Sequence, residues 1–385
     1  MADKYRQALG QIIREPGNGA CADCGTERPT WASSTIGIFL CQDCAGMHRA
    51  LNSVSRVKSV TLDNWDSDQV ELMQGIGNNR AKERYELHVP PFYRRPQKES
   101  VDVLKKEWIF AKYQRLEFTD ADKQESYNCA KKEGLLLKLG RDRKLFQQRK
   151  FVLSRPENKL QYFVIEESSK APRPKAEIDL DEVNAVFVPE KIGHPYGMQI
   201  TFYKNGSTRS LFVHSESSRD IVDWYHAIRA AKLERRRIAF PDRDLDTLAE
   251  DLTRDFMLEG WLNKMGPRNE PFKRRWFTLD KRKLMYYEDP LNAFPKGEIF
   301  IGHRDAGYHV TTGASEDKPT GSSPFCFTLH TPDRKFVLKA ETKEEMDKWV
   351  DTLNKVIDMP LTPQDSKLAA ILVPKKSNSI RLIKR

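Results

Sequence analysis

The sequence predicts an α+β protein of three parts, in which a small helical module with four paired cysteines precedes two similar antiparallel β-domains. Three observations predict this fold class. Two cysteine pairs lie near the N-terminus, a long pattern occurs twice in the remainder, and each copy of it changes from short strands to a helical segment with one tryptophan. A chain of 385 residues is long enough for roughly two to four domains.

The composition is that of a globular protein. Hydrophobic residues make up 39% of the chain and charged residues 31%. The sequence contains no run of about 18 apolar residues that could span a bilayer, and its first residues lack the apolar stretch of a secretory signal. We therefore expect a cytoplasmic protein.

The first module has the cysteine spacing of a zinc site. Cys21-x2-Cys24 and Cys41-x2-Cys44 are separated by 16 residues, so each pair can form a tight turn that presents two thiolates. Few cysteines arranged in close pairs favour metal over disulfides in a reducing compartment. Four thiolates complete a tetrahedral shell and leave no position for water, so we expect one structural Zn²⁺.

Helices are expected on both sides of the cysteines. Near the N-terminus apolar residues recur at helical spacing, at Tyr5, Leu9, Ile12 and Ile13. Pro16 and Gly17 should end that helix. Residues 66–130 have a mainly helical pattern, which the proline-rich segment 90–96 interrupts as a rigid extended stretch.

Two residues directly after the second cysteine pair are candidates for function. His48 and Arg49 fall in the first turns of a helix that zinc would hold at its start. Since four cysteines already suffice for the metal, a packed or capping role is expected for His48. Spacing alone favours a solvated or salt-bridged role for Arg49.

The rest of the chain contains two copies of one pattern. Glu133-Gly-Leu-Leu-Leu-Lys138 returns as Glu259-Gly-Trp-Leu-Asn-Lys264, and the glutamate lies 91 positions before Trp224 in one copy and 90 positions before Trp349 in the other. Each copy therefore predicts a curved antiparallel sheet closed by an amphipathic helix. The expected division of the chain is 1–127, 131–234, a linker 235–254, 255–358 and a basic tail 359–385.

The excess positive charge lies in the two repeated domains. Residues 1–130 carry 18 Lys+Arg and 18 Asp+Glu, residues 131–234 carry 19 and 14, and residues 235–385 carry 28 and 23. This distribution predicts that the second and third parts meet an anionic surface. The balanced first module lacks the basic footprint of a nucleic-acid-binding zinc finger, so no nucleic acid is expected as a partner.

The first module closely resembles the Arf GTPase-activating domain over about residues 5–125. The matching motifs surround the cysteines and are Pro29-Thr-Trp31-Ala-Ser33, Gly37-Ile-Phe-Leu-Cys41, Gly46-Met-His-Arg49, Val57-Lys-Ser59 and Leu62-Asp-x-Trp65. The resemblance implies that Arg49 is the catalytic finger, and that Trp31 and Ile36 hold the finger region and the bound GTPase. Asn52 departs from the glycine that many members have there.

This resemblance implies a GTPase activator that acts in trans on a GTP-bound Arf-family GTPase and is not itself an enzyme. A guanidinium supplied from outside stabilises the charge on the γ-phosphate oxygens, and such a finger contributes about 10³ to 10⁵ in rate. The alternative is a phosphoinositide-dependent adaptor whose zinc module binds partners without stimulating hydrolysis.

The repeated pattern resembles the pleckstrin-homology (PH) fold, and the order of the modules resembles the dual-PH Arf GAPs, or α-centaurins. In phosphoinositide-binding members, a lysine near the end of the first strand and an arginine in the second strand bind inositol phosphates. The resemblance thus implies headgroup ligands in the first domain at Lys138, Arg149, Tyr162 and Lys175. In the second domain the implied ligands are Lys264, Lys273, Arg275, Tyr287 and Lys296.

These ligands imply recruitment of a monomeric protein to the plasma membrane by phosphatidylinositol 3,4,5-trisphosphate, with the 4,5-bisphosphate as a second candidate. Gln147 and Gln148 stand in the first copy where the second has Lys273 and Arg274, so affinity or headgroup choice is expected to differ between the domains. The basic tail either is solvated or adds to membrane attraction.

Overall fold

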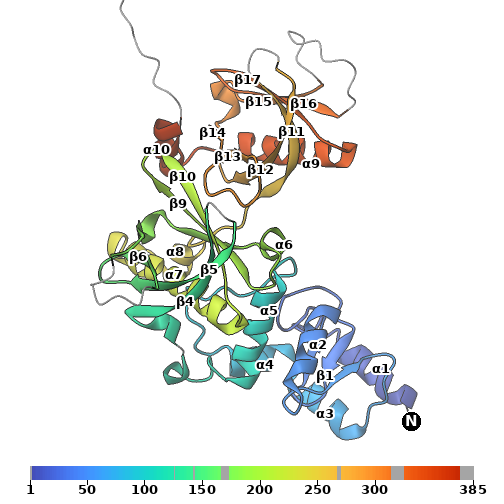
Figure 1. Cartoon of the computed structure of the whole chain (residues 1–385). Helices are drawn as coiled ribbons and strands as arrows, with labels where there is room; N and C mark the ends of the chain where they lie inside the picture. Colours follow the sequence, from blue (N-terminus) through green and yellow to red (C-terminus); the bar gives the residue numbers. More distant parts are fainter. Residues whose placement is uncertain are drawn as a thin grey trace, which may run out of the picture.

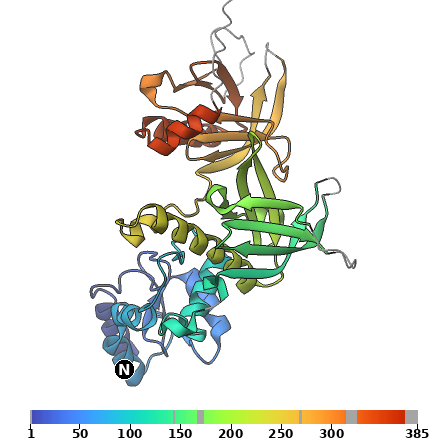
Figure 2. The ribbon, with the colours of Figure 1, turned by 90° about the vertical axis from the view of Figure 1, so that its left-hand side faces the viewer.

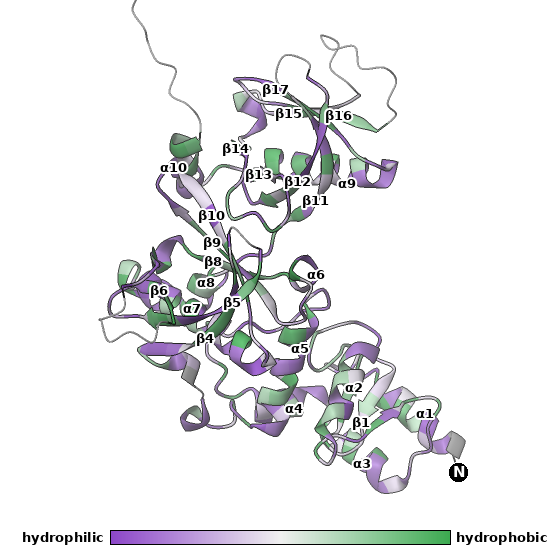
Figure 3. Cartoon of the chain, viewed as in Figure 1, coloured by the Kyte–Doolittle hydropathy of each residue, from purple (hydrophilic) through white to green (hydrophobic). Residues whose placement is uncertain are grey.

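The computed structural model describes residues 2–124, 126–141, 144–165, 173–266, 270–313 and 325–372, and its three parts follow one another along the molecule in chain order (Figures 1 and 2). The basic end of the tail, residues 373–385, lies outside the described residues. Within them no helix is long and apolar enough to cross a membrane, and the long helices mix hydrophilic and hydrophobic residues (Figure 3). The predicted fold class is confirmed.

The first module combines a three-stranded sheet with helices. The sheet has the order β2-β1-β3 and consists of β1 (Trp31–Ser33), β2 (Ile38–Leu40) and β3 (Val57–Ser59). Its helices are α1 (Ala2–Ile12), α2 (Gln42–His48), α3 (Ser67–Gly75), α4 (Gly77–Tyr85) and α5 (Asp102–Ile109), and α5 continues as a π-helical segment, η2 (Phe110–Gln114). The helical spacing near the N-terminus is realised in α1, where Leu9 and Ile12 are buried against Met73 of α3.

The first PH domain is a seven-stranded antiparallel sheet with the order β7-β6-β5-β4-β10-β9-β8. Pairing of its first strand in sequence, β4, with its last, β10, joins a four-stranded and a three-stranded half into one open barrel. Its strands are β4 (Lys131–Leu139), β5 (Phe146–Ser154), β6 (Lys159–Val164), β7 (Ala176–Asp179), β8 (Asn184–Phe187), β9 (Gly197–Lys204) and β10 (Ser207–His214). A short helix, α6 (Pro189–Ile192), precedes β9, and the long α7 (Ser218–Ala239) closes the barrel.

The second PH domain repeats this architecture with the order β14-β13-β12-β11-β17-β16-β15. Its strands are β11 (Leu258–Met265), β12 (Phe272–Asp280), β13 (Lys283–Tyr287), β14 (Gly297–Phe300), β15 (His309–Thr312), β16 (Cys326–His330) and β17 (Lys335–Lys339). The closing helix is α9 (Lys343–Asp358), which α10 (Pro363–Leu372) follows. Between the two PH domains lies α8 (Leu245–Ala249).

In both copies the glycine of the first strand lies against the tryptophan of the closing helix. Trp224 and Trp349 are almost fully buried under their barrels. A Cβ added at Gly134 would lie 3.3 Å from the Trp224 ring, and one at Gly260 would lie 3.8 Å from that of Trp349. The glycine of the first strand therefore makes room for the tryptophan of the closing helix in both copies.

The first module and the first PH domain share one continuous core. The proline-rich segment packs onto α7, where the rings of Tyr93 and His226 stack with their centroids 3.7 Å apart. Arg229 of α7, which is 4% exposed, donates from Nε to the Phe92 carbonyl over 2.6 Å and from Nη1 to Thr253 Oγ1 over 2.7 Å. The segment that the sequence marks as rigid is thus an interface between domains.

Candidate functional site

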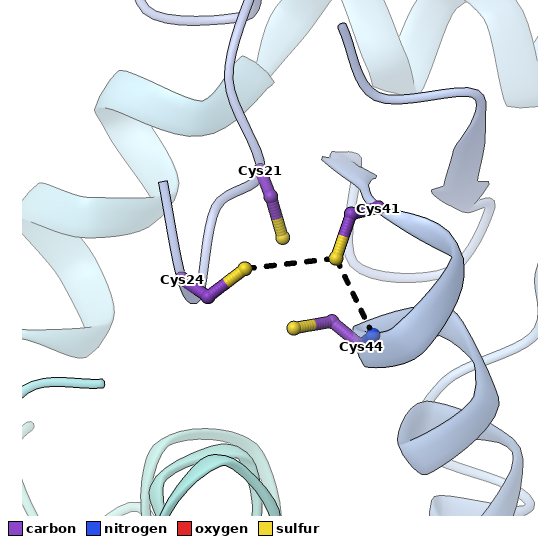
Figure 4. Close-up of side chains that lie close together, drawn as sticks. All are labelled: Cys21, Cys24, Cys41 and Cys44. Atoms are coloured by element: carbon purple, nitrogen blue, oxygen red, sulfur yellow. Dashed lines mark hydrogen bonds between the residues drawn. The ribbon is translucent and has the colours of Figure 1, made fainter. Parts of the chain in front are cut away.

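The four cysteines of the two pairs converge on one point. Their Sγ atoms all lie within 4.8 Å of one another, and Figure 4 shows the side chains pointing toward a common centre. The Sγ atoms of Cys24 and Cys41 are 3.6 Å apart, far beyond the bond of about 2.05 Å in a disulfide. Zn–S bonds of about 2.3 Å in a tetrahedron would place the sulfurs roughly 3.8 Å apart. The donor set therefore fits a zinc ion.

Local structure delivers each pair to this centre. In the first pair a tight turn brings the Gly25 N–H to the Cys21 carbonyl over 3.0 Å, and Gly25 has a left-handed φ of +72°. In the second pair Cys41 caps α2, and its sulfur accepts from the backbone N–H of Cys44 over 3.5 Å. The positive end of α2 thus points at the cluster and favours thiolates.

Arg49 directly follows α2 and projects from the surface. Its guanidinium carbon lies 4.8 Å from the ring centroid of Trp31, and among the described residues no carboxylate pairs with it. The chain turns at Asn52, whose φ of +44° lies in the region that glycine adopts most readily. Ile36 is only 4% exposed and belongs to the buried core that the first module shares with the first PH domain.

A buried polar network links the loop of the first cysteine pair to His48 at the end of α2. Nε2 of His48 lies 2.9 Å from the Asp23 carboxylate, and its Nδ1 lies 2.8 Å from Ser55 Oγ, so His48 packs as expected and is not a metal ligand. Lys112 of η2 pairs with Asp23 over 3.0 Å. Although burial alone would raise the pKa of Asp23, Lys112 and His48 lower it to about 2. Sequence reasoning missed Asp23, although its place between two zinc cysteines is a signal.

The strand register of the first PH domain gathers the expected headgroup ligands at one end of the barrel. Lys138 lies opposite Gln147, and Arg149 follows two positions later on the same face of the sheet. Lys138 Nζ lies 5.3 Å from the ring centroid of Tyr162. Burial, followed by the charges of Arg209 and Arg149, lowers the pKa of Lys138 to about 8. This mouth thus concentrates positive charge.

The second PH domain has the same arrangement with one correction. Lys264 lies directly opposite Lys273, and Arg275 follows on that face. Tyr286, not Tyr287, corresponds to Tyr162, because Lys264 Nζ lies 5.1 Å from the Tyr286 ring. Side chains alternate between faces along a strand, and the buried Tyr287 hydroxyl instead contacts Met285 Sδ at 3.4 Å. The expectation for Tyr287 was therefore wrong by one position.

The weaker candidates lie at the rims of the mouths. Lys175 and Lys296 are exposed and donate backbone hydrogen bonds to Tyr162 and Tyr286, respectively, at matching places in the two copies. Sequence reasoning missed Arg209 of β10, which contributes to the positive potential at Lys138. A signal for Arg209 exists, since it lies 15 positions before Trp224, as Arg334 lies 15 positions before Trp349.

Comparison with known proteins agrees with this organisation. The family described as "Putative GTPase activating protein for Arf" matches residues 6–122, and the PH domain matches residues 130–233 and 256–358. The human "Arf-GAP with dual PH domain-containing protein 2" is 44% identical over 370 residues, covering 94% of this chain and 95% of that protein, and its mouse counterpart is 45% identical over 370 residues with the same coverage. Human "Stromal membrane-associated protein 1" is 41% identical over 119 residues, which are 31% of this chain and 25% of that protein. The chain belongs to the family of Arf GTPase-activating proteins with two PH domains.

Proposed function

We propose that this protein stimulates hydrolysis by a GTP-bound Arf-family GTPase, acting in trans with Arg49 as its arginine finger. The observation that carries the proposal is an exposed arginine without a carboxylate partner among the described residues, held directly behind a helix that begins at the cysteine cluster. A guanidinium fixed in this way needs little reorganisation to meet the charge that develops on the γ-phosphate.

Trp31 and the buried network would keep this finger in place. The Trp31 ring beneath the guanidinium restricts its position, and His48 ties the turn to Asp23 between two cysteines. One Zn²⁺ on the four cysteines would be structural, because four thiolates leave no site for water or substrate. The GTPase would hold the GTP that is hydrolysed, and this protein would add only the arginine.

We also propose that phosphoinositides recruit the protein from the cytoplasm to the plasma membrane as a monomer. Phosphatidylinositol 3,4,5-trisphosphate is the leading candidate and the 4,5-bisphosphate the second. The support is the pair of basic mouths, in which a phosphate would relieve the repulsion that Arg209 and Arg149 exert on Lys138. The proposed limits of the parts remain 1–127, 131–234, 255–358, with a linker 235–254 and a tail 359–385.

The test is single-turnover GTP hydrolysis by myristoylated Arf on vesicles with and without phosphatidylinositol 3,4,5-trisphosphate. Arg49→Lys should stimulate hydrolysis about 10³-fold less than the wild type does. Arg84→Lys, a matched change on the exposed side of α4, should stimulate it as the wild type does. Lys138→Met combined with Lys264→Met should abolish only the increase that the lipid produces. If Arg49→Lys binds the vesicles and stimulates like the wild type, the adaptor function replaces this proposal.

A further inference from the structure

The mouth of the first PH domain opens onto the second PH domain. A cavity of about 290 Å³ lies at this junction, and its size suits a small polar ligand. The first domain lines it with Lys138, Lys144 and Arg209, and the second lines it with Glu288, Phe294 and Lys296. All of these six side chains except Phe294 are charged, and four of the five charged ones are positive.

The segment between β13 and β14, residues 288–296, forms the far wall of this cavity. It is bonded to the edge of the first domain, because the Ser210 N–H donates to the Ala293 carbonyl over 2.8 Å. Just beyond it, Thr208 Oγ1 of β10 donates to Glu298 over 2.7 Å. In Figure 1, β10 reaches toward β13 and β14. These bonds hold the wall at a fixed distance from the mouth.

Phe294 of the wall packs against a cation of the mouth. The Arg209 guanidinium carbon lies 5.6 Å from the Phe294 ring centroid and 5.9 Å from that of Phe202 in its own domain. The Arg209 Nε atom is buried and has no hydrogen-bond partner among the described residues. The two rings thus orient a guanidinium for which the described part of the chain shows no carboxylate partner.

Two carboxylates of the wall neutralise cations of this region. Asp289 accepts from Lys144 Nζ over 2.9 Å, and Glu288 lies 3.2 Å from Lys296 Nζ. All four side chains are at least 42% exposed, so each pair is weak and easily exchanged. A ligand with several phosphates could take over both lysines, because phosphate oxygens accept charge-assisted hydrogen bonds from each.

We propose that the headgroup site of the first PH domain is composite, so that an inositol ring with adjacent phosphates is bound jointly by Lys138, Lys144 and Arg209 of the first domain and Lys296 of the second. This inference rests on the proposed phosphoinositide function. Lys296, which the family resemblance implies for the second mouth, thereby serves the first. Asp289 and Glu288 compete with the ligand for Lys144 and Lys296.

The test uses the full chain carrying Lys264→Met and Lys273→Ala, which disable the second mouth without removing residues of the wall. The probe is soluble inositol 1,3,4,5-tetrakisphosphate, and its Kd is measured by calorimetry. Phe294→Ala and Lys296→Met should each weaken binding about fivefold to tenfold. Asp289→Asn should tighten it about threefold, because it releases Lys144. Lys348→Met on the exposed side of α9 is the matched control and should change nothing.

One further variant separates this inference from the function on which it rests. If Lys138→Met, shown to be folded by its thermal midpoint, leaves binding unchanged, the first PH domain is no headgroup site and both proposals fail. If Lys138→Met abolishes binding while the changes at Phe294, Lys296 and Asp289 leave the Kd unaltered, only the composite site is overturned.

Vesicles of phosphatidylcholine with a few per cent phosphatidylinositol 3,4,5-trisphosphate identify the source of the ligand. The same order of variant effects on vesicle binding assigns a lipid headgroup to the composite site. Effects on the soluble probe without effects on vesicles assign a free inositol polyphosphate, because the wall would then keep the bilayer from the mouth. Either result supports the shared site.

Discussion

Replacing Arg229 by leucine should destabilise the first module and the first PH domain together. Arg229 lies on α7 of the PH domain, but its Nε donates to the carbonyl of Phe92 in the first module and its Nη1 to Thr253 in the connection to the second PH domain. A buried guanidinium therefore joins three segments that are distant in sequence.

The magnitude follows from these two short hydrogen bonds. Bonds from a charged donor contribute about 1.5 to 3 kcal/mol each, so their loss costs roughly 3 to 6 kcal/mol. Burial lowers the pKa of Arg229, which shows that burying its charge costs free energy. Leucine carries no charge, so the substitution removes this cost and offsets part of the loss. We expect a net loss of about 2 to 4 kcal/mol in the free energy of unfolding.

Urea denaturation measured by two probes tests this prediction. Zinc release reports on the first module, and tryptophan fluorescence reports on the whole chain, because three of its seven tryptophans lie in the first module and four in the PH domains. For Arg229→Leu both transitions should move to lower urea, whereas Arg237→Leu on the exposed side of α7 should shift neither by more than about 0.5 kcal/mol. Zinc release that keeps its wild-type midpoint in Arg229→Leu would refute the shared core.

Three further predictions concern stability. Cys41→Ser should release the metal and unfold the first module, seen as loss of bound zinc and rapid proteolysis of that module. Gly134→Ala should cost about 1 kcal/mol, since its Cβ would press on Trp224 at 3.3 Å, whereas Gly260→Ala, with 3.8 Å available, should stay within about 0.5 kcal/mol in thermal unfolding. Burial raises the pKa of Asp223 from 3.8 to about 7, so stability that is present below about pH 4 is lost as the pH rises toward 7. Asp223→Asn should therefore stabilise the protein at pH 8, by on the order of 2 kcal/mol, and should have no such effect at pH 4.

The zinc module and the two barrels were predictable because their signals are local or repeated. The cysteine pairs need only two tight turns to converge, and the repeat places Lys138 and Lys264 at equivalent strand ends. Tyr287 was misplaced because a shift of one residue in a strand moves a side chain to the opposite face. The repeat itself decides between the two tyrosines, because Lys159-Leu-Gln-Tyr162 aligns with Lys283-Leu-Met-Tyr286.

The contacts between domains could not be predicted from the sequence. The stacking of Tyr93 on His226 depends on how α7 lies against the first module, over 130 residues away in sequence. Similarly, Phe294 meets Arg209 only because the β13–β14 segment packs on β10. Such contacts depend on the relative orientation of whole domains, which local patterns of polarity do not encode.

The central claim is that Arg49 acts on the transition state of GTP hydrolysis. Its most direct test is the affinity of the wild type and Arg49→Lys for Arf·GDP with and without aluminium fluoride, which mimics the γ-phosphoryl group in transit. A finger binds the transition state more tightly than the ground state, so aluminium fluoride should raise the affinity of the wild type by at least about 10²-fold and that of Arg49→Lys hardly at all. An equal increase for both proteins would contradict the account.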